Sequence, residues 1–331
     1  KDNLIYLLDN LNLATKKLLF ENARKTLKKT YDKKVFLRAL IEFSNYCKNN
    51  CKYCGIRKDN EKIKRYRLKS EDIIKCCDKA ASLGYKTIVL QSGEDNYYND
   101  EILINIIKKI KNSHPEIALT LSIGEKSCKS YKKLFEAGVD RYLLRHETIY
   151  ENNYKKFHPD MSMNNRIKCL YNLKKIGYQV GAGFIVGLPD QDNTTIAENL
   201  LFLKKLTPHM VGTGPLIPHP ETPLAQYQPG SVDKTLIILA LTRLLLPEVL
   251  LPATTALNTL DNKGWEKGLK AGANVIMPNI TPEFTRDRYE LYKNKGSIDV
   301  ASIEKIKSKI NKVNFEIDME RGDHLKWKNN R

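Results

Sequence analysis

Short apolar runs alternate with amphipathic helical stretches along most of this chain. Four helical stretches stop at a glycine (Gly84, Gly138, Gly177 and Gly272), and a β-rich run follows each within a few residues. Glycine suits the left-handed residue just past the end of a helix. The pattern therefore predicts a repeated unit of helix, glycine and buried strand.

Eight β-like runs fit this unit, and their starts lie about 23 to 49 residues apart. That spacing leaves room for a helix between successive strands, which is typical of βαβ units rather than hairpins. Eight such units predict an α/β fold of the (β/α)8 TIM-barrel type. The predicted strands are Leu37–Phe43, Lys86–Gln91, Ile117–Ile123, Arg141–Glu147, Gln179–Leu188, Met210–Pro218, Leu250–Ala256 and Ala273–Asn279.

Helix signals complete the predicted layout of one domain over residues 1–331. Ser70 and Asp192 each stand as a capping residue before an apolar-periodic stretch. The stretch Val232–Leu246 is apolar nearly all round, which predicts a helix packed tightly on the barrel. We expect N-terminal helices up to about Tyr31 to pack against a barrel of about 37–279. We expect a helical extension over about 280–331, including a helix from Ile303 onward.

Composition narrows the function classes. Hydrophobic residues make up 41% of the chain, which is ample for a core, and we find no apolar run long enough to span a membrane. The formal net charge is +18, but the lysines are scattered over helix faces and no RNA-binding motif accompanies them. We therefore interpret the charge as a solvated surface and do not expect a nucleic-acid partner. The chain opens inside an amphipathic helical pattern, so we expect its N-terminus to lie upstream.

Three cysteines carry the most specific chemical signal. Cys47, Cys51 and Cys54 form a C-x3-C-x2-C loop directly after the first predicted strand. Iron in a four-iron cluster takes one cysteine per metal, so this loop would leave one iron open to an outside ligand. A zinc knuckle needs a fourth ligand nearby, and the nearest histidine is His114. We favour an iron–sulfur cluster over zinc.

The other four cysteines give no comparable pattern. The total of 7 Cys is odd and no secretory signature is present, which argues against a disulfide framework. We interpret Cys76, Cys77, Cys128 and Cys169 as reduced structural thiols, as expected in a reducing compartment. The cytoplasm fits, and an organelle matrix stays open.

Polar residues gather where the predicted strands end. The second run ends in Gln91-Ser92-Gly93-Glu94-Asp95, and the fourth in Arg145-His146-Glu147-Thr148. The other ends are Thr120 to Glu125, Gly187-Leu188-Pro189, Pro218-His219-Pro220, Thr254-Thr255 and Met277-Pro278-Asn279. In a (β/α)8 barrel, active sites lie at the C-terminal ends of the strands, so these groups predict a polar cavity there.

With the cysteine loop, the Gly-Glu after the second strand and the Gly-rich fifth strand, the chain resembles the radical S-adenosylmethionine (SAM) enzymes. Within them it resembles the maturases that help to build the active-site cluster of [FeFe]-hydrogenase. The resemblance covers about 37–279 and rests on Glu42 to Cys47, Leu90 to Asp95, Tyr142 to Thr148, Val186 to Gln191, Gly214 to Pro220, Pro252 to Ala256 and Asn274 to Asn279.

The resemblance implies a cofactor site. Cys47, Cys51 and Cys54 would ligate a [4Fe-4S] cluster whose open iron is chelated by SAM, and reduction would cleave SAM to methionine and a 5′-deoxyadenosyl radical. The SAM contacts would be Tyr53 beside the adenine, Ile185 and Leu188 at its edge, Gly93 and Glu94 at the methionyl amino group, Arg166 at the carboxylate, Glu147 at an amino or hydroxyl group, and Ser122. Taken singly, Tyr53 could be ordinary packing, and Glu147 with Arg166 an ordinary ion pair.

The resemblance also implies a substrate: a small anionic, cysteine-bound iron carbonyl cyanide complex, attacked by the radical at its cysteine sulfur. The cavity residues that line up with it are Ser92, Thr120, Arg145, Thr254, Thr255 and Met277, although strand propensity alone accounts for threonines. The implied partners are other hydrogenase maturation proteins and an electron donor such as ferredoxin or flavodoxin.

Two alternatives stay open. A methylornithine-synthase-like amino-acid mutase would share the barrel and a single cluster. A biotin-synthase-like sulfur insertion normally needs a second cluster, and no Cys follows Cys169 in this chain. For the same reason we expect a single cluster. A non-catalytic iron–sulfur protein would usually fill all four ligand positions, so we rank it below the enzymes.

Overall fold

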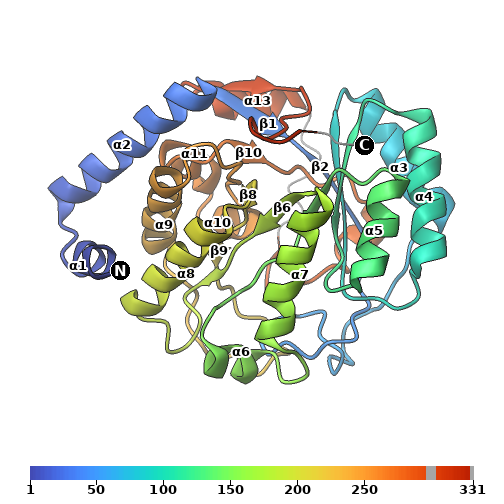
Figure 1. Ribbon diagram of the computed structural model, residues 1–331, viewed down its shortest axis with the longest axis horizontal. Coiled ribbons are helices and arrows are strands. Elements are labelled where there is room, and N and C mark those ends of the chain that lie inside the picture. Colours follow the sequence, from blue (N-terminus) through green and yellow to red (C-terminus); the bar gives the residue numbers. More distant parts are fainter. Residues whose placement is uncertain (296–302, 329–331) are drawn as a thin grey trace.

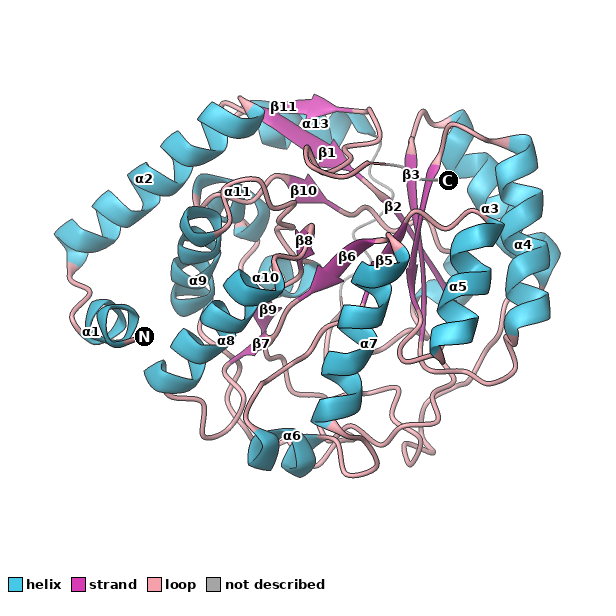
Figure 2. Ribbon diagram, in the orientation of Figure 1, coloured by secondary structure: helices cyan, strands magenta, loops and turns pink. Residues whose placement is uncertain are grey.

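A ring of parallel strands surrounded by helices forms the body of the molecule (Figures 1 and 2). The computed structural model describes residues 1–295 and 303–328. Six strands form one parallel sheet in the order β2 (Ala39–Ser44), β3 (Thr87–Ser92), β4 (Ala118–Ser122), β5 (Arg141–Leu143), β6 (Gln179–Ala182) and β8 (Met210–Val211). Every pair in this sheet is parallel, as the predicted βαβ units require.

Single bridges close the ring on its remaining side. Met210 pairs with Leu250, and Pro252 pairs with Val275, both in parallel. β10 (Val275–Ile276) then pairs with β1 (Lys34–Leu37), and Leu40 pairs with Asn279. The eight predicted runs are therefore neighbours in chain order around a closed ring, and the (β/α)8 prediction is confirmed. Pairing is sparse around Pro252 because proline has no N–H to donate to a ladder.

The fifth and sixth predicted strands each divide in two. β7 (Ile185–Val186) and β9 (Gly214–Pro215) follow β6 and β8 and pair with each other separately. At the division Gly183 has a φ of +150°, and a Cβ there would lie 2.0 Å from the carbonyl oxygen of Gly212. Only glycine fits this close approach of two backbones. The predicted runs 179–188 and 210–218 bend here instead of continuing straight.

Thirteen helices are formed by the described residues. The helices that surround the barrel are α3 (Ser70–Ser82), α4 (Asp100–Ser113), α5 (Cys128–Ala137), α6 (Glu151–Phe157), α7 (Met163–Ile176), α8 (Asn193–Leu206), α9 (Val232–Leu245), α10 (Thr255–Leu260) and α11 (Gly264–Lys270). Asp192 caps α8 as predicted, accepting from the Thr195 N–H at 2.7 Å. The predicted cap at Ser70 is wrong: Lys69 holds that position without a side-chain bond, so Ser70 is the first residue of the helix.

The N-terminal helices α1 (Asp2–Asp9) and α2 (Leu13–Tyr31) pack on the barrel from outside, as expected. α1 lies against α8 and α2 against α9. α9 is buried at every position from Thr235 to Arg243, which explains its uniformly apolar sequence. None of the described helices has the length and hydropathy needed to cross a bilayer.

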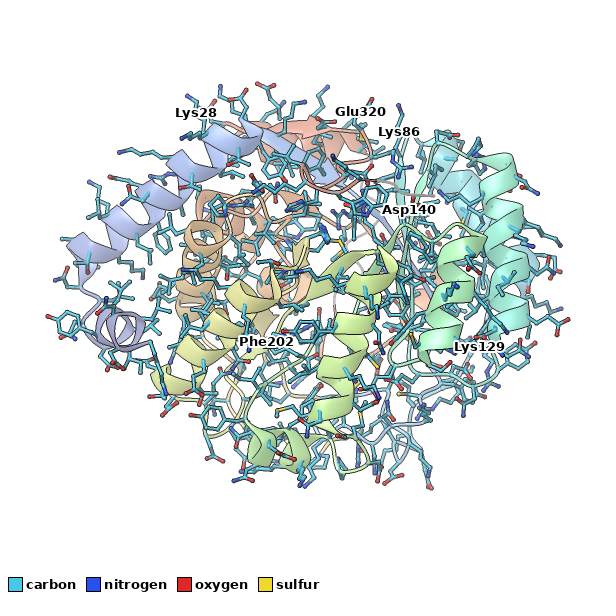
Figure 3. The ribbon with its side chains drawn as sticks, viewed as in Figure 1. Lys28, Lys86, Lys129, Asp140, Phe202 and Glu320 are labelled. Carbon is cyan, nitrogen blue, oxygen red and sulfur yellow. The ribbon has the colours of Figure 1, made fainter. Side chains whose placement is uncertain are left out.

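The C-terminal segment departs from the prediction. α12 (Glu283–Arg286) and α13 (Ile303–Asn311) are helical, but β11 (Glu316–Asp318) is a strand that pairs in parallel with β1. The prediction of a helix from Ile303 onward is therefore wrong beyond Asn311, because the free edge of β1 offers backbone partners that a sequence pattern does not reveal. Residues further on cross the N-terminal end of the barrel, where Glu320 meets Lys86 at 3.2 Å (Figure 3).

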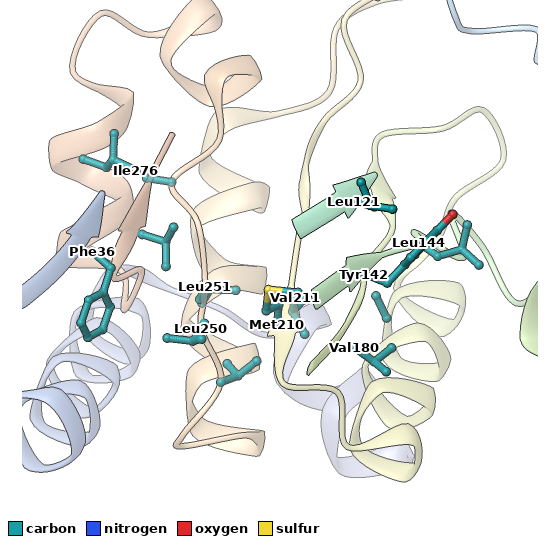
Figure 4. Packing of buried hydrophobic residues seen from close by; sticks show 14 of the residues in the cluster. Phe36, Leu121, Tyr142, Leu144, Val180, Met210, Val211, Leu250, Leu251 and Ile276 are labelled. Atoms are coloured by element: carbon teal, nitrogen blue, oxygen red, sulfur yellow. The ribbon is translucent and has the colours of Figure 1, made fainter. Parts of the chain in front are cut away.

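The core fills the ring and the space between strands and helices. Phe36, Met210, Leu250 and Ile276 are buried among it, with Tyr142 and Val180 on neighbouring strands (Figure 4). The apolar interior ends toward the C-terminal ends of the strands, where the side chains become charged.

Candidate functional site

The cysteine loop leaves the C-terminal end of β2 and is held on two sides. The Lys48 N–H donates to the Glu94 carbonyl oxygen at 3.0 Å, and the Lys52 N–H donates to that of Phe157 at 2.9 Å. A turn in which the Cys54 N–H donates to the Cys51 carbonyl at 3.2 Å completes the loop. The three predicted ligands Cys47, Cys51 and Cys54 are half-buried and carry free thiols. The structure therefore brings them together on one short, anchored loop.

The surroundings of the three thiols disfavour the charged thiolate form unless positive charge is bound nearby. Burial raises the pKa of Cys54 to about 12, with Cys47 adding to the effect. Burial likewise raises the pKa of Cys51, and the thiols of Cys54 and Cys47 raise it further. Thiolates are the metal ligands, and a bound metal group supplies the charge that stabilises them. Among the described residues no three His, Cys, Asp or Glu side chains surround a single ion; a four-iron cluster takes one cysteine per iron.

Gly93 allows the end of β3 to approach this loop. A Cβ at Gly93 would lie 2.2 Å from the Tyr46 carbonyl oxygen and 2.7 Å from Cβ of Cys47. The Gly93 N–H donates to the Ser44 carbonyl oxygen at 3.2 Å. Any side chain at this position would push the first cysteine out of place, so the glycine is a packing requirement of the cysteine loop.

A buried carboxylate–guanidinium network lies beside the loop. Arg166 on α7 places Nε 2.7 Å from Oε1 of Glu125 and a terminal nitrogen 3.6 Å from Oε1 of Glu94. Burial acts to lower the pKa of Arg166, but Tyr154, Glu125 and Glu94 outweigh it and raise that pKa well above its ordinary value. Arg166 is therefore a permanent cation. It is anchored at Nε by Glu125, with its other end directed toward Glu94.

Glu147 pairs with a different arginine. Its Oε2 lies 3.0 Å from Arg145, and burial raises the pKa of Glu147 against the opposing charges of Arg145 and Arg166. Its backbone has a φ of +63°, and its N–H donates to the Gly183 carbonyl at 3.0 Å. A non-glycine residue at positive φ is strained, and such strain is concentrated at functional sites. The simple ion pair between Glu147 and Arg166 does not form.

The predicted adenine side is apolar. Tyr53, Ile185 and Leu188 belong to one small hydrophobic cluster together with Phe157, Leu216 and Leu224. The Tyr53 hydroxyl lies 2.8 Å from Nε2 of His158. Ser122 is the last residue of β4 and is half-buried, and it lies opposite Gln91 of β3.

The predicted substrate residues lie in or just after five of the predicted strands, Thr120 in the middle of β4. Two of them hold buried polar atoms without hydrogen-bond partners: the Thr120 hydroxyl and Nε of Arg145. Unpartnered buried polar groups are costly, so their presence suits a polar ligand. Ser92 donates to the Gly93 carbonyl at 2.7 Å. Thr254 caps α10, accepting from the Leu257 N–H at 3.3 Å, and Thr255 is the first residue of that helix. Met277 follows β10 and packs on the core.

Sequence reasoning missed Glu125, Tyr154 and His158. Glu125 follows β4 in the same Gly-Glu pairing that singled out Glu94, so that signal was available. Tyr154 lies in α6 and His158 is the residue directly after it, and their rings stack with centroids 4.3 Å apart. Only the fold brings them to the cysteine loop. Of the remaining thiols, Cys76, Cys77 and Cys169 are buried as expected of structural cysteines, whereas Cys128 is exposed at the start of α5.

Comparison with known proteins agrees with this geometry. The Radical SAM superfamily model matches residues 41–203. The [FeFe] hydrogenase maturase subunit HydE of Thermotoga maritima is 50% identical over 277 residues, which cover 84% of this chain and 79% of that protein. This chain belongs to the radical SAM superfamily. Enzymes of this superfamily use a [4Fe-4S] cluster and SAM, and the three-thiol loop with its open fourth position fits that cluster.

Two further proteins are similar to this chain in sequence or fold. The 3-methylornithine synthase of Methanosarcina acetivorans is 32% identical over 262 residues, covering 78% of this chain and 73% of that protein. A crystal structure of methylornithine synthase superposes with a TM-score of 0.84 at 26% identity, covering 96% of this chain and 93% of that one. The [FeFe]-hydrogenase maturase HydG matches with a TM-score of 0.79 at 21% identity, covering 95% of this chain and 71% of that one, which speaks for the fold alone.

Proposed function

We propose that this chain is a radical SAM maturase of [FeFe]-hydrogenase. The observation that carries the proposal is the 50% identity to the HydE maturase over 84% of the chain. The half-buried cysteine loop and the charged network at the strand ends support it. When bound and reduced, the [4Fe-4S] cluster supplies the electron that cleaves SAM to methionine and a 5′-deoxyadenosyl radical.

In this proposal different residues bind different parts of the SAM molecule. Cys47, Cys51 and Cys54 hold three irons. Arg166 pairs with the methionyl carboxylate, since a guanidinium and a carboxylate form a bidentate fork. The Gly93-Glu94 segment accepts from the amino group, and Glu147 accepts from a ribose hydroxyl. Tyr53, Ile185, Leu188 and Ser122 surround the adenosine.

The proposed substrate is a small anionic iron–cysteine complex, attacked at its cysteine sulfur. Arg145 offers a cation and the Thr120 hydroxyl an uncommitted donor. Both suit cyanide or carboxylate groups. Ser92, Thr254, Thr255 and Met277 would complete the cavity wall.

We further propose a single cluster, because no Cys follows Cys169. Anaerobically reconstituted protein should bind about four irons per chain. A clearly larger iron content would contradict the single-cluster proposal. Its partners would be other hydrogenase maturation proteins and a ferredoxin or flavodoxin, in a reducing and anaerobic compartment such as the bacterial cytoplasm.

Two experiments test the proposal in sequence. Reconstituted protein with SAM and dithionite should form 5′-deoxyadenosine, and failure with an intact cluster would defeat every radical SAM interpretation. A strain lacking the maturase should regain hydrogenase activity when it expresses this chain. Cys51→Ala should restore none, because one iron loses its ligand, whereas Cys128→Ala changes an exposed thiol outside the loop and should restore activity fully.

A second candidate is an amino-acid mutase like methylornithine synthase. The TM-score of 0.84 over 96% of the chain favours it as the alternative. Its decisive observation would be formation of methylornithine by the reconstituted protein, together with failure to restore hydrogenase activity.

A further inference from the structure

Positive charge is concentrated on the cysteine loop and the segment that follows it. Residues 48–69, between β2 and α3, hold nine Lys and Arg against Asp59 and Glu61. The chain's net charge of +18 over 331 residues would give an average segment of this length a charge near +1. The interpretation of the basic residues as evenly scattered therefore does not hold here.

Several of these charges are exposed and uncompensated. Lys58, Lys64 and Lys69 are exposed, and no acidic side chain within the described ranges 1–295 and 303–328 pairs with them. Lys62 is also exposed but pairs with Glu221 at 2.7 Å. We call Lys58, Lys64 and Lys69 the basic face. Two of its members are bonded to the ends of the cysteine loop through their backbones: the Lys58 N–H donates to the Asn49 carbonyl oxygen at 2.9 Å, and the Lys64 carbonyl oxygen accepts from Nδ2 of Asn45 at 3.0 Å.

The backbone that carries this face is firmly built. Arg65 donates to the carbonyl oxygens of Asn45 at 2.6 Å, Ile56 at 2.9 Å and Arg57 at 2.6 Å, which ties the segment to both ends of the cysteine loop. Arg67 stacks on the Tyr46 ring at 3.7 Å and pairs with Asp95 at 2.7 Å. The exposed lysines are thus fixed relative to Cys47 and Cys54 and do not lie on a loose loop.

A cluster on this loop needs an electron from outside the chain. This requirement rests on the proposed function: a reduced carrier would be oxidised by one electron, and a cluster held by Cys47, Cys51 and Cys54 would pass that electron to SAM, whose carbon–sulfur bond would break to give methionine and the 5′-deoxyadenosyl radical. The basic face lies on the segment that follows the cysteine loop and is bonded to it, so a carrier docked there would lie close to the cluster ligands. Complementary charge raises association rates and orients the encounter.

We propose that the basic face is the docking surface for an acidic one-electron carrier protein. The rival explanation is a general excess of charge, and the chain offers a matched test of it. α2 is also lysine-rich, and Lys25, Lys28 and Lys29 on it are exposed. α2 lies across the opposite end of the barrel from the cysteine loop, as the position of Lys28 in Figure 3 and the course of the chain in Figure 1 show.

The test compares two triple variants of equal charge change. Lys58→Glu/Lys64→Glu/Lys69→Glu alters the basic face, and Lys25→Glu/Lys28→Glu/Lys29→Glu alters α2. Binding of oxidised flavodoxin to each reconstituted holoprotein is measured at low salt by surface plasmon resonance. We expect the Kd to rise about tenfold or more for the basic-face variant and less than about twofold for the α2 variant. The difference should fade as added salt shortens the screening length.

A second arm measures 5′-deoxyadenosine formation with two reductants. With reduced flavodoxin the basic-face variant should be slowed about tenfold, and with dithionite, which needs no docking surface, it should match the parent protein. Equal loss in both triple variants, or unchanged flavodoxin binding by the basic-face variant, would overturn the proposal. So would tight, basic-face-dependent binding of an RNA oligonucleotide in place of flavodoxin.

The same arms separate the docking surface from the proposed function. If the parent protein makes no 5′-deoxyadenosine with dithionite, the proposed function fails while the binding arm still decides the docking surface. If the triple glutamate variant loses its cluster, Lys58→Gln/Lys64→Gln/Lys69→Gln replaces it. Neutralising three charges should still weaken flavodoxin binding about threefold to tenfold, and unchanged binding would overturn the proposal.

Discussion

The Tyr53 hydroxyl lies 2.8 Å from Nε2 of His158, and the two residues connect the cysteine loop to the end of α6. Nδ1 of His158 lies 3.0 Å from the Tyr154 carbonyl oxygen, so Nδ1 donates there and Nε2 accepts from Tyr53. Burial lowers the pKa of His158 to about 3, which keeps the ring neutral and this arrangement intact. The Lys52 N–H adds a bond to Phe157 from the same loop.

We predict that His158→Phe weakens the hold on the cysteine loop. The change keeps an aromatic ring but leaves the Tyr53 hydroxyl buried without an acceptor, at a cost of about 1–3 kcal/mol. Iron release to a chelator under anaerobic conditions should accelerate about tenfold, as that cost implies. In Tyr53→Phe/His158→Phe both partners are apolar and no polar group is left unpaired. Iron release should therefore accelerate less in the double variant than the effects of the two single variants combined would give. Iron release at the parent rate in His158→Phe would contradict the link.

Glu125 should act on SAM binding through Arg166. Its Oε1 lies 2.7 Å from Nε of Arg166, whose terminal nitrogens lie 3.2 Å from the Arg145 carbonyl oxygen and 3.6 Å from Oε1 of Glu94. Glu125→Gln removes the charge that orients the arginine, so the KM for SAM should rise about tenfold while kcat changes less than about threefold. Asn165→Ala removes the hydrogen bond that the neutral Asn165 amide donates to Oε2 of Glu125, keeps the Glu125 charge, and is the control. A KM that stays at the parent value would show that Arg166 orients itself.

The barrel was predictable because its signals are local. A helix that ends at Gly138 or Gly177 and a strand that follows can be found within a dozen residues, and the repetition fixes the topology. β11 was not predictable, since a three-residue strand forms only where the edge of β1 is free to receive it. The cap at Lys69 was missed because a nearby Ser70 imitates the usual signal.

The candidate site also has one part that the sequence predicts and one part that it does not. Three cysteines within eight residues are visible in the sequence, and their loop forms as expected. The partner of Arg166 was not visible, because Glu94, Glu125 and Glu147 all follow strands of the ring and any of them could face it. In the structure Glu125 and Glu94 reach Arg166, while Glu147, at positive φ, pairs with Arg145.

Gly124 provides a test of how tightly Glu94 is placed. Gly124 has a φ of +76°, and a Cβ there would lie 1.9 Å from Cγ of Glu94. Gly84 has a similar φ of +86°, but its nearest neighbour is Cε of Met319 at 3.7 Å. Both alanine variants should lose about 1–2 kcal/mol from the left-handed backbone. Only Gly124→Ala must also displace Glu94.

We therefore expect Gly124→Ala to bind SAM more weakly, by about tenfold in an equilibrium titration, because Glu94 can no longer face Arg166 or take its proposed place at the methionyl amino group. Gly84→Ala should bind SAM like the parent protein despite a similar loss in its free energy of unfolding. Equal SAM affinities for the two variants would show that Glu94 does not need this position.

His146 should make stability depend on pH. It is fully buried, its Nδ1 accepts from the Gly183 N–H at 3.3 Å, and its Nε2 lies 3.1 Å from Oδ1 of Asn199. Burial lowers the pKa of His146 to about 3. Protonating Nδ1 would set one donor against another, so the folded protein keeps the ring neutral. Once unfolded, the ring takes up a proton near its ordinary pKa of about 6.5.

Between about pH 6.5 and pH 3 the unfolded chain thus binds a proton that the folded chain does not, so the free energy of unfolding falls as the pH falls. From pH 7.5 to pH 5 we expect His146 to account for a loss of about 2 kcal/mol. His146→Gln should reduce the slope of the free energy of unfolding in urea against pH by about a quarter to a third, because His158, His209 and His324, whose pKa values burial also lowers, keep contributing. A slope that His146→Gln fails to change would mean that the buried ring takes up its proton without unfolding.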